Sequence, residues 1–494
     1  MRLATLRCLV LLIVIAASVA CATNPVTGRR ELILMSPERE AALGAQAAEQ
    51  VARQIGLVED AELAAYVDAL GQRLAAFSPR TEVTHRFAVA DMPEPNAFAL
   101  PGGWIYVSRG LLALANSESE LANVIGHEIG HVAARHSAQR ETRSVGVGLL
   151  SVIGTIAAGV TAGGDAAQAV AQLGQVAGAG LIASYGRDQE RQADRVGQDL
   201  AAAAGWDPRG MPAFLGSLGR ASALIAGGER RPSFLDSHPL TSERVESTIA
   251  YAEDLPVAAT APVAADRADF LVRLEDLLLG PDPAQGVFDG SLFLHPDLGL
   301  ALRFPQGWRT VNAATAVAAQ TPEGDAVLVL ETQGESGDPG AAAAAFARAN
   351  GLQLQGGAPV TLGGWPAHRA RAAARTQQGD LGLDLTWIAH PSATFRLTGL
   401  TALARFDDHV RAFEEAAASL HALDAAERAG ITELRLRVVR ARSGETLAAL
   451  SQRTGNAWNV EETAIANALE EQALLDGGQR VKIAVEEPYR QKVE

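Results

Sequence analysis

The sequence predicts an α+β fold in which a mainly helical N-terminal domain with a small edge sheet precedes two smaller α+β modules. Three observations lead to this prediction. Apolar residues recur with helical spacing over much of the first 250 residues, whereas alternating, strand-like patterns dominate after about residue 286. The length of 494 residues corresponds to about three domains of roughly 150 residues each. A hydrophobic share of 48% with 20% charged residues is typical of globular protein and excludes a wholly disordered chain.

The charge and cysteine content exclude two classes of protein. The net charge of −15 argues against a general phosphate-binding surface, so we expect no nucleic-acid partner. Two cysteines are too few for a disulfide scaffold. The chain is long enough to bury a core without such links.

The N-terminus has the pattern of an export signal. Arg2 and Arg7 precede an uncharged stretch over residues 8–20, which is too short for a membrane span, so residues 1–20 are predicted to be a signal peptide. The sequence Ser18-Val19-Ala20-Cys21 resembles a bacterial lipobox, with Ser18 departing from the preferred Leu. Lipidation of Cys21 would make residues 21–35 a membrane-anchored tether. The absence of Asp after Cys21 favours the outer membrane by resemblance to bacterial sorting rules. An uncleaved anchor and a simple cleaved signal are the alternatives.

The predicted first domain, residues 36–254, begins with two helices. Ser36-Pro37-Glu38 has helix-start chemistry, because Ser caps the first turn, Pro fits the first helical position and an acid favours the positive end. This helix is expected to run to about Ile55, and a second covers about residues 60–77 with its apolar side chains on one face. Three short strands are then expected at residues 86–90, 97–100 and 104–108.

Helices are expected to dominate the rest of this domain. They are predicted at about residues 110–115, 119–136 and 181–202. Between the last two, residues 144–164 and 166–186 carry no charge and have the length of a transmembrane hairpin. Their Gly, Ala, Ser and Thr content and three Gln residues favour a buried helix pair instead. Residues 226–240 are polar and contain Gly and Pro, which is typical of a loop.

The tail is predicted to contain a linker and two modules. The linker spans residues 255–285, beginning with a Pro/Ala-rich stretch. The first module, residues 286–425, is expected to hold strands near 293–308, 325–332, 383–390 and 394–401 and helices near 340–350 and 404–421. The second, residues 432–486, reads as strand, two helices and a last strand. We find no internal repeat.

Residues 127–131, His-Glu-Ile-Gly-His, carry the clearest chemical signal. On a helix, His127 and His131 lie on one face about one turn apart, where two imidazoles can bind one Zn²⁺. Glu128 between them can act on the water at the metal. The alternative is a helix with two hydrogen-bonded histidines, but buried histidines on an apolar helix face need a partner. His136 lies about 140° from the ligand face if the helix continues, and we interpret it as structural.

A third ligand is needed, because catalytic zinc usually has three protein ligands and one water. Glu190 is the best candidate, since it follows the long uncharged segment after the His-Glu motif. Asp194 lies four residues further, on the same helix face, where it can accept the N–H of a ligand histidine. The alternative interpretation of Glu190 and Asp194 is a solvated charged face.

These residues together resemble the gluzincin peptidases of the HtpX-like and CAAX-prenyl-endopeptidase family. The resemblance covers about residues 21–250 and adds three further matches: Asn96 to Gly103 before the metal helix, His238-Pro239 with Arg244 after it, and residues 24–28 at the entry of lipoprotein members. In the tail, residues 286–421 vaguely resemble a PsbP/Mog-like module. Residues 432–486 resemble a divergent LysM unit, which makes peptidoglycan a weak candidate ligand.

The resemblance implies a zinc metalloendopeptidase of the periplasm that cleaves unfolded or misassembled envelope proteins. It implies one Zn²⁺ per chain, Glu128 as the general base, and Asn96, Ala97, Phe98 and Ala99 on the edge strand that binds substrate by strand addition. His238 is expected to donate to the oxyanion, with Arg244 supporting its loop. Alternatively, His238 occupies the open metal position, which would make residues 226–240 a self-inhibiting lid.

Two other functions remain open at this point. The first is a largely self-inhibited, chaperone-like assembly factor for outer-membrane proteins, in which the C-terminal modules carry the binding and contact the assembly machinery. The second is an integral membrane protease that uses residues 144–186 as a hairpin. Prenyl-protein processing is not expected, because the chain lacks the several strong spans that such an enzyme needs.

Overall fold

A computed structural model describes residues 21–142, 184–225, 234–313, 316–376 and 379–491, and these form two compact units. Unit 1 contains the described residues up to Leu279 together with Arg435–Val485. Unit 2 contains Gly280–Leu434 and the C-terminal residues from Glu486 onward. Both units mix helices with sheets, which confirms the predicted α+β class. The boundaries of the tail modules remain a prediction.

Unit 1 begins with a two-stranded hairpin. Strand β1 (Cys21–Thr23) pairs antiparallel with β2 (Arg30–Leu32), and the amide of Gly28 donates to the carbonyl of Asn24 at 2.8 Å. Asn24 is fully buried and its Oδ1 accepts from the amide of Val26. The turn predicted within residues 21–35 is therefore confirmed, and a strand pair flanks it.

Two helices and a three-stranded sheet follow. Helix α2 (Pro37–Gln54) starts at the predicted cap, where Ser36 Oγ accepts from the amide of Arg39, and α3 (Ala61–Ala75) is capped by Asp60. The strands are β3 (Arg86–Ala90), β4 (Ala97–Leu100) and β5 (Trp104–Ser108), close to their predicted positions. Their order is β3-β5-β4, with β3 parallel and β4 antiparallel to β5, so β4 is an edge strand.

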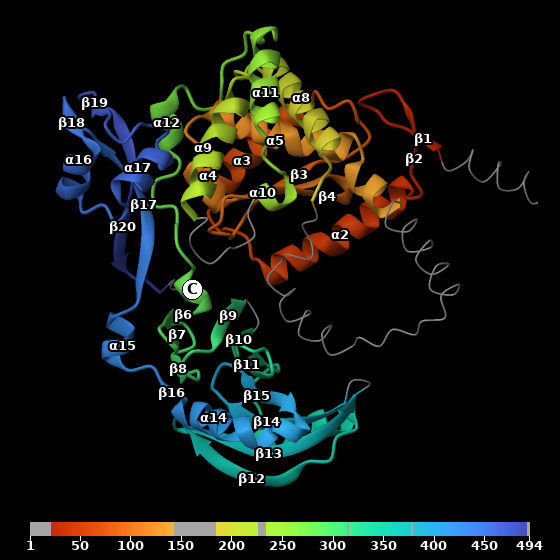
Figure 1. Ribbon diagram of the computed structural model, residues 1–494, viewed down its shortest axis with the longest axis vertical. Helices are drawn as coiled ribbons and strands as arrows, with labels where there is room; N and C mark the ends of the chain where they lie inside the picture. Colours follow the sequence, from red (N-terminus) through yellow and green to blue (C-terminus); the bar gives the residue numbers. More distant parts are fainter. Residues whose placement is uncertain (1–20, 143–183, 226–233, 314–315, 377–378, 492–494) are drawn as a thin grey trace, which may run out of the picture. The chain divides into compact units, whose positions relative to one another are not determined.

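Further helices of unit 1 follow among the described residues (Figure 1). They are α4 (Arg109–Leu114), α5 (Glu118–Ala133), α8 (Arg187–Ala203), α9 (Gly210–Ile225), α10 (Phe234–Ser237) and α11 (Ser242–Glu253). Helices α9 and α11 were not predicted, and α10 lies inside the segment predicted as a loop. Helix α12 (Arg267–Val272) lies within the segment predicted as a linker, and its Phe270 and Leu271 are fully buried in the unit 1 core.

Small residues bring α5 and α8 unusually close, and Figure 1 shows the two helices side by side. A Cβ atom at Gly197 of α8 would lie 2.7 Å from the amide nitrogen of His127 and 2.9 Å from the carbonyl oxygen of Asn123. A Cβ atom at Gly126 of α5 would lie 2.8 Å from the carbonyl oxygen of Gly197. Only glycine permits these backbones to approach this closely, so the crossing depends on sequence at both helices.

We expect Gly197→Ala to destabilise the protein by about 1–3 kcal/mol, because the added methyl meets backbone atoms that cannot rotate away. Gly216→Ala is the matched control, since a Cβ atom at Gly216 in α9 meets nothing within 4 Å. Alanine is the better helix former, so the control should be neutral or more stable by up to about 1 kcal/mol. Urea denaturation of both variants would test this, and equal stabilities would contradict it.

Residues of the C-terminal segment pack into the same core. Leu436 and Ile465 belong to the unit 1 core cluster, and Lys482 is fully buried. The Lys482 ammonium donates to the carbonyls of Ala113 and Ala115, each at 2.7 Å, at the end of α4. The elements here are β17 (Thr432–Arg440), β18 (Glu445–Thr446), α16 (Leu447–Thr454), α17 (Val460–Ala466), β19 (Leu474–Leu475) and β20 (Arg480–Pro488). The predicted strand–helix–helix–strand order is confirmed.

Unit 2 is built on two antiparallel sheets. A seven-stranded sheet has the order β12-β13-β14-β15-β11-β10-β9, and a four-stranded sheet has the order β16-β8-β7-β6. The strands are β6 (Val287–Asp289), β7 (Leu292–His295), β8 (Leu300–Arg303), β9 (Arg309–Ala313), β10 (Ala316–Gln320), β11 (Ala326–Thr332), β12 (Gln355–Leu362), β13 (Trp365–Thr376), β14 (Gly379–Ala389), β15 (Thr394–Ala402) and β16 (His421–Ala422). The helices are α13 (Pro339–Asn350), α14 (Phe406–Ser419) and α15 (Ala425–Ala429).

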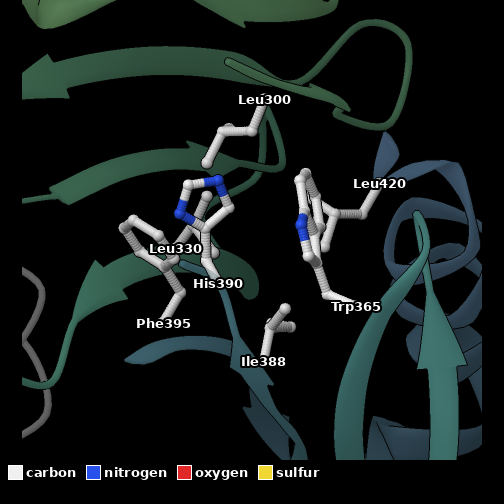
Figure 2. Close-up of a pocket in the computed structure, with 7 residues that line it drawn as sticks. All are labelled: Leu300, Leu330, Trp365, Ile388, His390, Phe395 and Leu420. Atoms are coloured by element: carbon white, nitrogen blue, oxygen red, sulfur yellow. The ribbon is translucent and has the colours of Figure 1, made fainter. Parts of the chain in front are cut away.

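Unit 2 also contains a narrow apolar pocket (Figure 2). It is lined by Leu300, Leu330, Trp365, Ile388, His390, Phe395 and Leu420. The ring of His390 lies edge-on to Trp365 at 4.7 Å between centroids, and burial lowers its pKa. His390 is therefore a packing residue, and it lies in none of the groups of described residues that could hold a metal.

Three predicted features fall outside the described residues. These are the signal peptide over residues 1–20, most of the uncharged segment 144–186, and residues 226–233 of the predicted lid. Over the described part of the chain, none of the helices combines the length and apolar character that a bilayer span requires.

Candidate active site

Helices α5 and α8 present the predicted residues to one another. The spacing of four places His127 and His131 on one face of α5, and it places Glu190 and Asp194 on one face of α8. All four side chains are at most 2% exposed. Four ionisable groups at this depth require strong partners, because an unpaired buried charge is costly.

The side chains converge with the spacing that a small cation needs. His127, His131, Glu190 and His238 each offer one ligand atom, and these atoms lie within 4.8 Å of one another. Nε2 of His127 lies 3.0 Å from Nε2 of His131, and Nε2 of His131 lies 3.4 Å from Oε1 of Glu190. Ligands around tetrahedral zinc are about 3.3 Å apart at bond lengths of about 2.0–2.1 Å. The nitrogen and carboxylate donors therefore fit a zinc ion.

Asp194 and Arg244 support this group from behind. Nδ1 of His127 lies 2.9 Å from Oδ1 of Asp194. The other ring nitrogen, Nε2, therefore points toward the cluster. Arg244 donates to both carboxylate oxygens of Asp194, at 2.8 and 2.7 Å, and lies 2.7 Å from Oε2 of Glu190. Although burial raises the pKa of Asp194, the contacts with His127 and Arg244 outweigh it and lower the pKa. Asp194 is thus held as an anion.

Glu128 is the least satisfied carboxyl in the site. It is fully buried, and neither of its oxygens meets hydrogen-bond geometry with a described residue, although the backbone amide of Ala99 is close enough to lower its pKa. Oε1 lies 3.5 Å from Nε2 of His238. Burial raises the pKa of Glu128, against the lowering influence of His238 and His127. A carboxyl with a raised pKa beside a cation site is suited to accepting and returning a proton.

His238 lies within the cluster itself. Its Nδ1 is 3.2 Å from Nε2 of His127 and 3.0 Å from Oε1 of Glu190. The ring stacks on Phe234 of α10 at 4.1 Å between centroids, and Arg244 donates to its carbonyl at 3.3 Å. The residue predicted from the His-Pro motif is thus brought to the ligand atoms.

The model of peptidase family M48 matches residues 61–251, which contain every one of these side chains. This segment is similar to peptidase family M48. The predicted gluzincin resemblance and the metalloprotease class are therefore confirmed for residues 61–251.

Curated relatives match the M48 segment at moderate identity. The beta-barrel assembly-enhancing protease of Yersinia pestis is 32% identical over 216 residues, covering 43% of each chain. That of Escherichia coli K12 is 30% identical, covering 45% of this chain and 46% of its own. The mitochondrial metalloendopeptidase OMA1 of Arabidopsis thaliana is 33% identical, covering 34% of this chain and 32% of its own. The chain spans less than half the length of these relatives.

Among solved structures, the solution structure of PsbP from Synechocystis sp. PCC 6803 shows a TM-score of 0.24 at 16% identity. It covers 29% of this chain and 98% of that chain.

The M48 segment places Asn96, Ala97, Phe98 and Ala99 beside the cluster, on and just before strand β4. The amide of Ser108 in β5 donates to the carbonyl of Asn96, so Asn96 and Phe98 face β5. Backbone groups alternate along a strand, so those of Ala97 and Ala99 face away from β5, at the edge of the sheet, where both residues are buried. The backbone amide of Ala99 contributes to lowering the pKa of Glu128, which puts this edge next to the carboxyl.

His136 lies next to His131, and not on the far side of the helix as predicted. The helix predicted over 119–136 ends at Ala133, and Arg135 adopts φ 58°, in the left-handed region. The chain therefore turns, and Nδ1 of His136 comes to 2.8 Å from Nδ1 of His131. An angle of about 140° from the ligand face holds only for a continuous helix. No residue near this turn signals it, because Arg rarely adopts positive φ.

A buried ion network anchors this end of α5 in the M48 segment. Glu40 of α2 accepts two hydrogen bonds from Arg80, at 2.8 and 3.1 Å, and one from Arg135 at 3.0 Å. Arg80 also donates to the carbonyl of Val132 at the end of α5. These three side chains are at most 7% exposed. Sequence analysis did not find them, because isolated Arg and Glu residues usually lie at the surface.

Proposed function

We propose that the protein is a zinc-dependent metalloendopeptidase of the bacterial periplasm that cleaves unfolded or misassembled envelope proteins. The observation that carries the proposal is the buried group of ligand atoms within 4.8 Å of one another, with the Glu128 carboxyl beside it. His127, His131 and Glu190 hold one Zn²⁺, and Asp194 and Arg244 orient them. When bound, zinc polarises the scissile carbonyl and lowers the pKa of a water molecule.

The other steps are carried by the chain itself. Glu128 takes the proton of the attacking water and delivers it to the leaving amine. The amides and carbonyls of Ala97 and Ala99 that face away from β5 bind the substrate backbone as an added strand, while Asn96 and Phe98 hold β4 against β5. This mode reads backbone rather than side chains, so it suits unfolded chains with loose sequence preference.

The experiment that tests the proposal measures zinc content and casein cleavage of the chain without residues 1–20. We expect about one zinc per chain, loss of cleavage after removal of the metal by a chelator, and recovery when zinc is returned. Zinc content near zero after reconstitution would overturn the metal site. Zinc at one per chain without cleavage would favour the second function below.

The second candidate function is a largely self-inhibited assembly factor for outer-membrane proteins. The position of Nδ1 of His238, 3.2 Å from Nε2 of His127 and 3.0 Å from Glu190, favours it. With zinc bound, a histidine at this position would compete with water for the metal. In this proposal, residues 234–240 with His238 close the site, and substrate binding displaces the ring.

His238→Ala discriminates the two roles of this histidine. If the ring closes the site, the variant should cleave casein several-fold faster than wild type at an unchanged zinc content, because the fourth position opens. If the ring instead donates to the oxyanion, cleavage should fall by roughly 10²–10³-fold. Cleavage no faster than that of wild type would count against self-inhibition.

Location and partners follow from sequence and from the names of the relatives. Two relatives are named beta-barrel assembly-enhancing proteases, so we propose outer-membrane β-barrel proteins and their assembly machinery as partners. Lipidated Cys21 anchors the chain, with the outer membrane as the proposed site. The PsbP/Mog-like and LysM-like modules provide additional binding, with peptidoglycan as the weakest candidate. Release of a Cys21→Ser variant from the membrane fraction would support the anchor.

A further inference from the structure

His136 contacts the metal-site histidine His131 from behind. Nδ1 of His136 lies 2.8 Å from Nδ1 of His131, and Nε2 of His136 lies 3.0 Å from Oε1 of Gln192. His136 is fully buried, and Gln192 lies on α8 between Glu190 and Asp194. The three side chains thus form a chain of hydrogen bonds that joins the end of α5 to α8.

The donors and acceptors of this chain can be assigned in order. An amide oxygen only accepts, so Nε2 of His136 carries a hydrogen and donates to Gln192. In neutral His136 the other nitrogen, Nδ1, is then an acceptor. Nδ1 of His131 must therefore be the donor, which leaves the lone pair of its Nε2 directed at His127 and Glu190. That is the tautomer that a metal ligand needs.

The reverse orientation of the Gln192 amide would give the opposite result. Its NH₂ would donate to His136, whose Nδ1–H would donate to His131, and Nε2 of His131 would then carry the hydrogen. A protonated Nε2 cannot bind a metal. The orientation of the Gln192 amide therefore determines, through His136, which ring nitrogen of His131 carries the hydrogen.

The other ligand histidine has a different support. Nδ1 of His127 lies 2.9 Å from the Asp194 carboxylate, which Arg244 holds. Behind His131 the partner is the imidazole of His136 instead of a carboxylate, and Tyr185 stacks on the His131 ring at 3.8 Å between centroids. Helix α8 thus supplies three of these side chains. Glu190 is part of the cluster, Asp194 contacts His127, and Gln192 contacts His136, which in turn contacts His131.

We propose that His136 and Gln192 are positioning residues that fix the tautomer and ring orientation of His131 for metal binding. This inference rests on the proposed zinc site. It predicts that removing His136 weakens zinc binding by about 10- to 100-fold, the range typical of supporting partners of metal ligands.

The test is zinc affinity, measured by competition with a chromophoric chelator on metal-free chains without residues 1–20. We expect His136→Ala to bind about 10- to 100-fold more weakly than wild type. His136→Asn should recover most of this loss, because its amide oxygen can accept near the position of Nδ1. His85→Ala is the matched control: His85 is a buried histidine outside the cluster, and its loss should leave zinc affinity unchanged.

The zinc affinities of the variants test the role of His136, and the affinity of wild type tests the zinc site itself. His136→Ala with the affinity of wild type would overturn the inference, and so would His136→Asn binding as weakly as His136→Ala. If His136→Ala does not fold, Gln192→Leu takes its place, and an unchanged affinity there would equally overturn it. If wild type itself binds no zinc, the proposed function fails instead.

Discussion

The Glu128→Gln variant is expected to lose casein cleavage by roughly 10²–10⁴-fold while keeping about one zinc per chain. Glutamine has the shape of glutamate but cannot take a proton from water. The carboxyl is fully buried, and neither of its oxygens meets hydrogen-bond geometry with a described residue, so little structure depends on its charge. Cleavage rate and zinc content measured on the same preparation separate loss of catalysis from loss of metal.

Glu120→Gln is the matched control for this prediction. Glu120 is also buried in α5, and its Oε2 accepts from the amide of Asn116, outside the metal cluster. The same chemical change there should leave cleavage within a few-fold of wild type. If both variants lose activity to a similar degree, the effect comes from the helix and Glu128 is not the base.

The Glu40→Gln variant is expected to destabilise the protein by about 3–5 kcal/mol. It removes the carboxylate that accepts from both Arg80 and Arg135, leaving two guanidinium groups at 3% and 7% exposure without that charge. Arg80 also supports the carbonyl of Val132, so the end of α5 should loosen. The urea midpoint of unfolding measures the loss of stability, and hydrogen exchange in α2 and α5 locates it.

Glu82→Gln provides the comparison, because Glu82 binds the same Arg80 at 3.0 Å but is 64% exposed. A solvent-exposed partner contributes at most about 1 kcal/mol. A Glu40→Gln variant that is no less stable than Glu82→Gln would show that burial of this network adds nothing.

The site was predictable from sequence where a short spacing determines which residues meet. His127 and His131, and separately Glu190 and Asp194, are four apart on helices, so each pair shares a face whatever the rest of the fold does. The contact between the two helices could be inferred only from the coordination chemistry of zinc, because a catalytic zinc ion needs a third protein ligand. The glycines that let them meet, Gly126 and Gly197, carry no such signal in a chain with 48 glycines.

The remaining parts depend on backbone geometry that a single sequence does not reveal. His136 was misplaced because α5 stops at Ala133 and Arg135 turns the chain. In the tail, β12 was missed because its Gly, Ala and Pro content is weak in strand formers, and it is stabilised by pairing with β13. Helix α11 was not predicted, although the side chain of Thr241 accepts from the amide of Arg244 at its start.

The contact between Lys482 and the end of α4 has a consequence for the order in which the protein is built. Its acceptor Ala113 lies 369 positions earlier in the chain, so the last carbonyls of the helix that precedes the metal helix gain this donor only after residue 482 has been synthesised. Until then the carbonyls of Ala113 and Ala115 lack this donor. The nascent M48 segment would thus finish folding late, and a chain shortened before Arg435 would lack a part of its own peptidase unit.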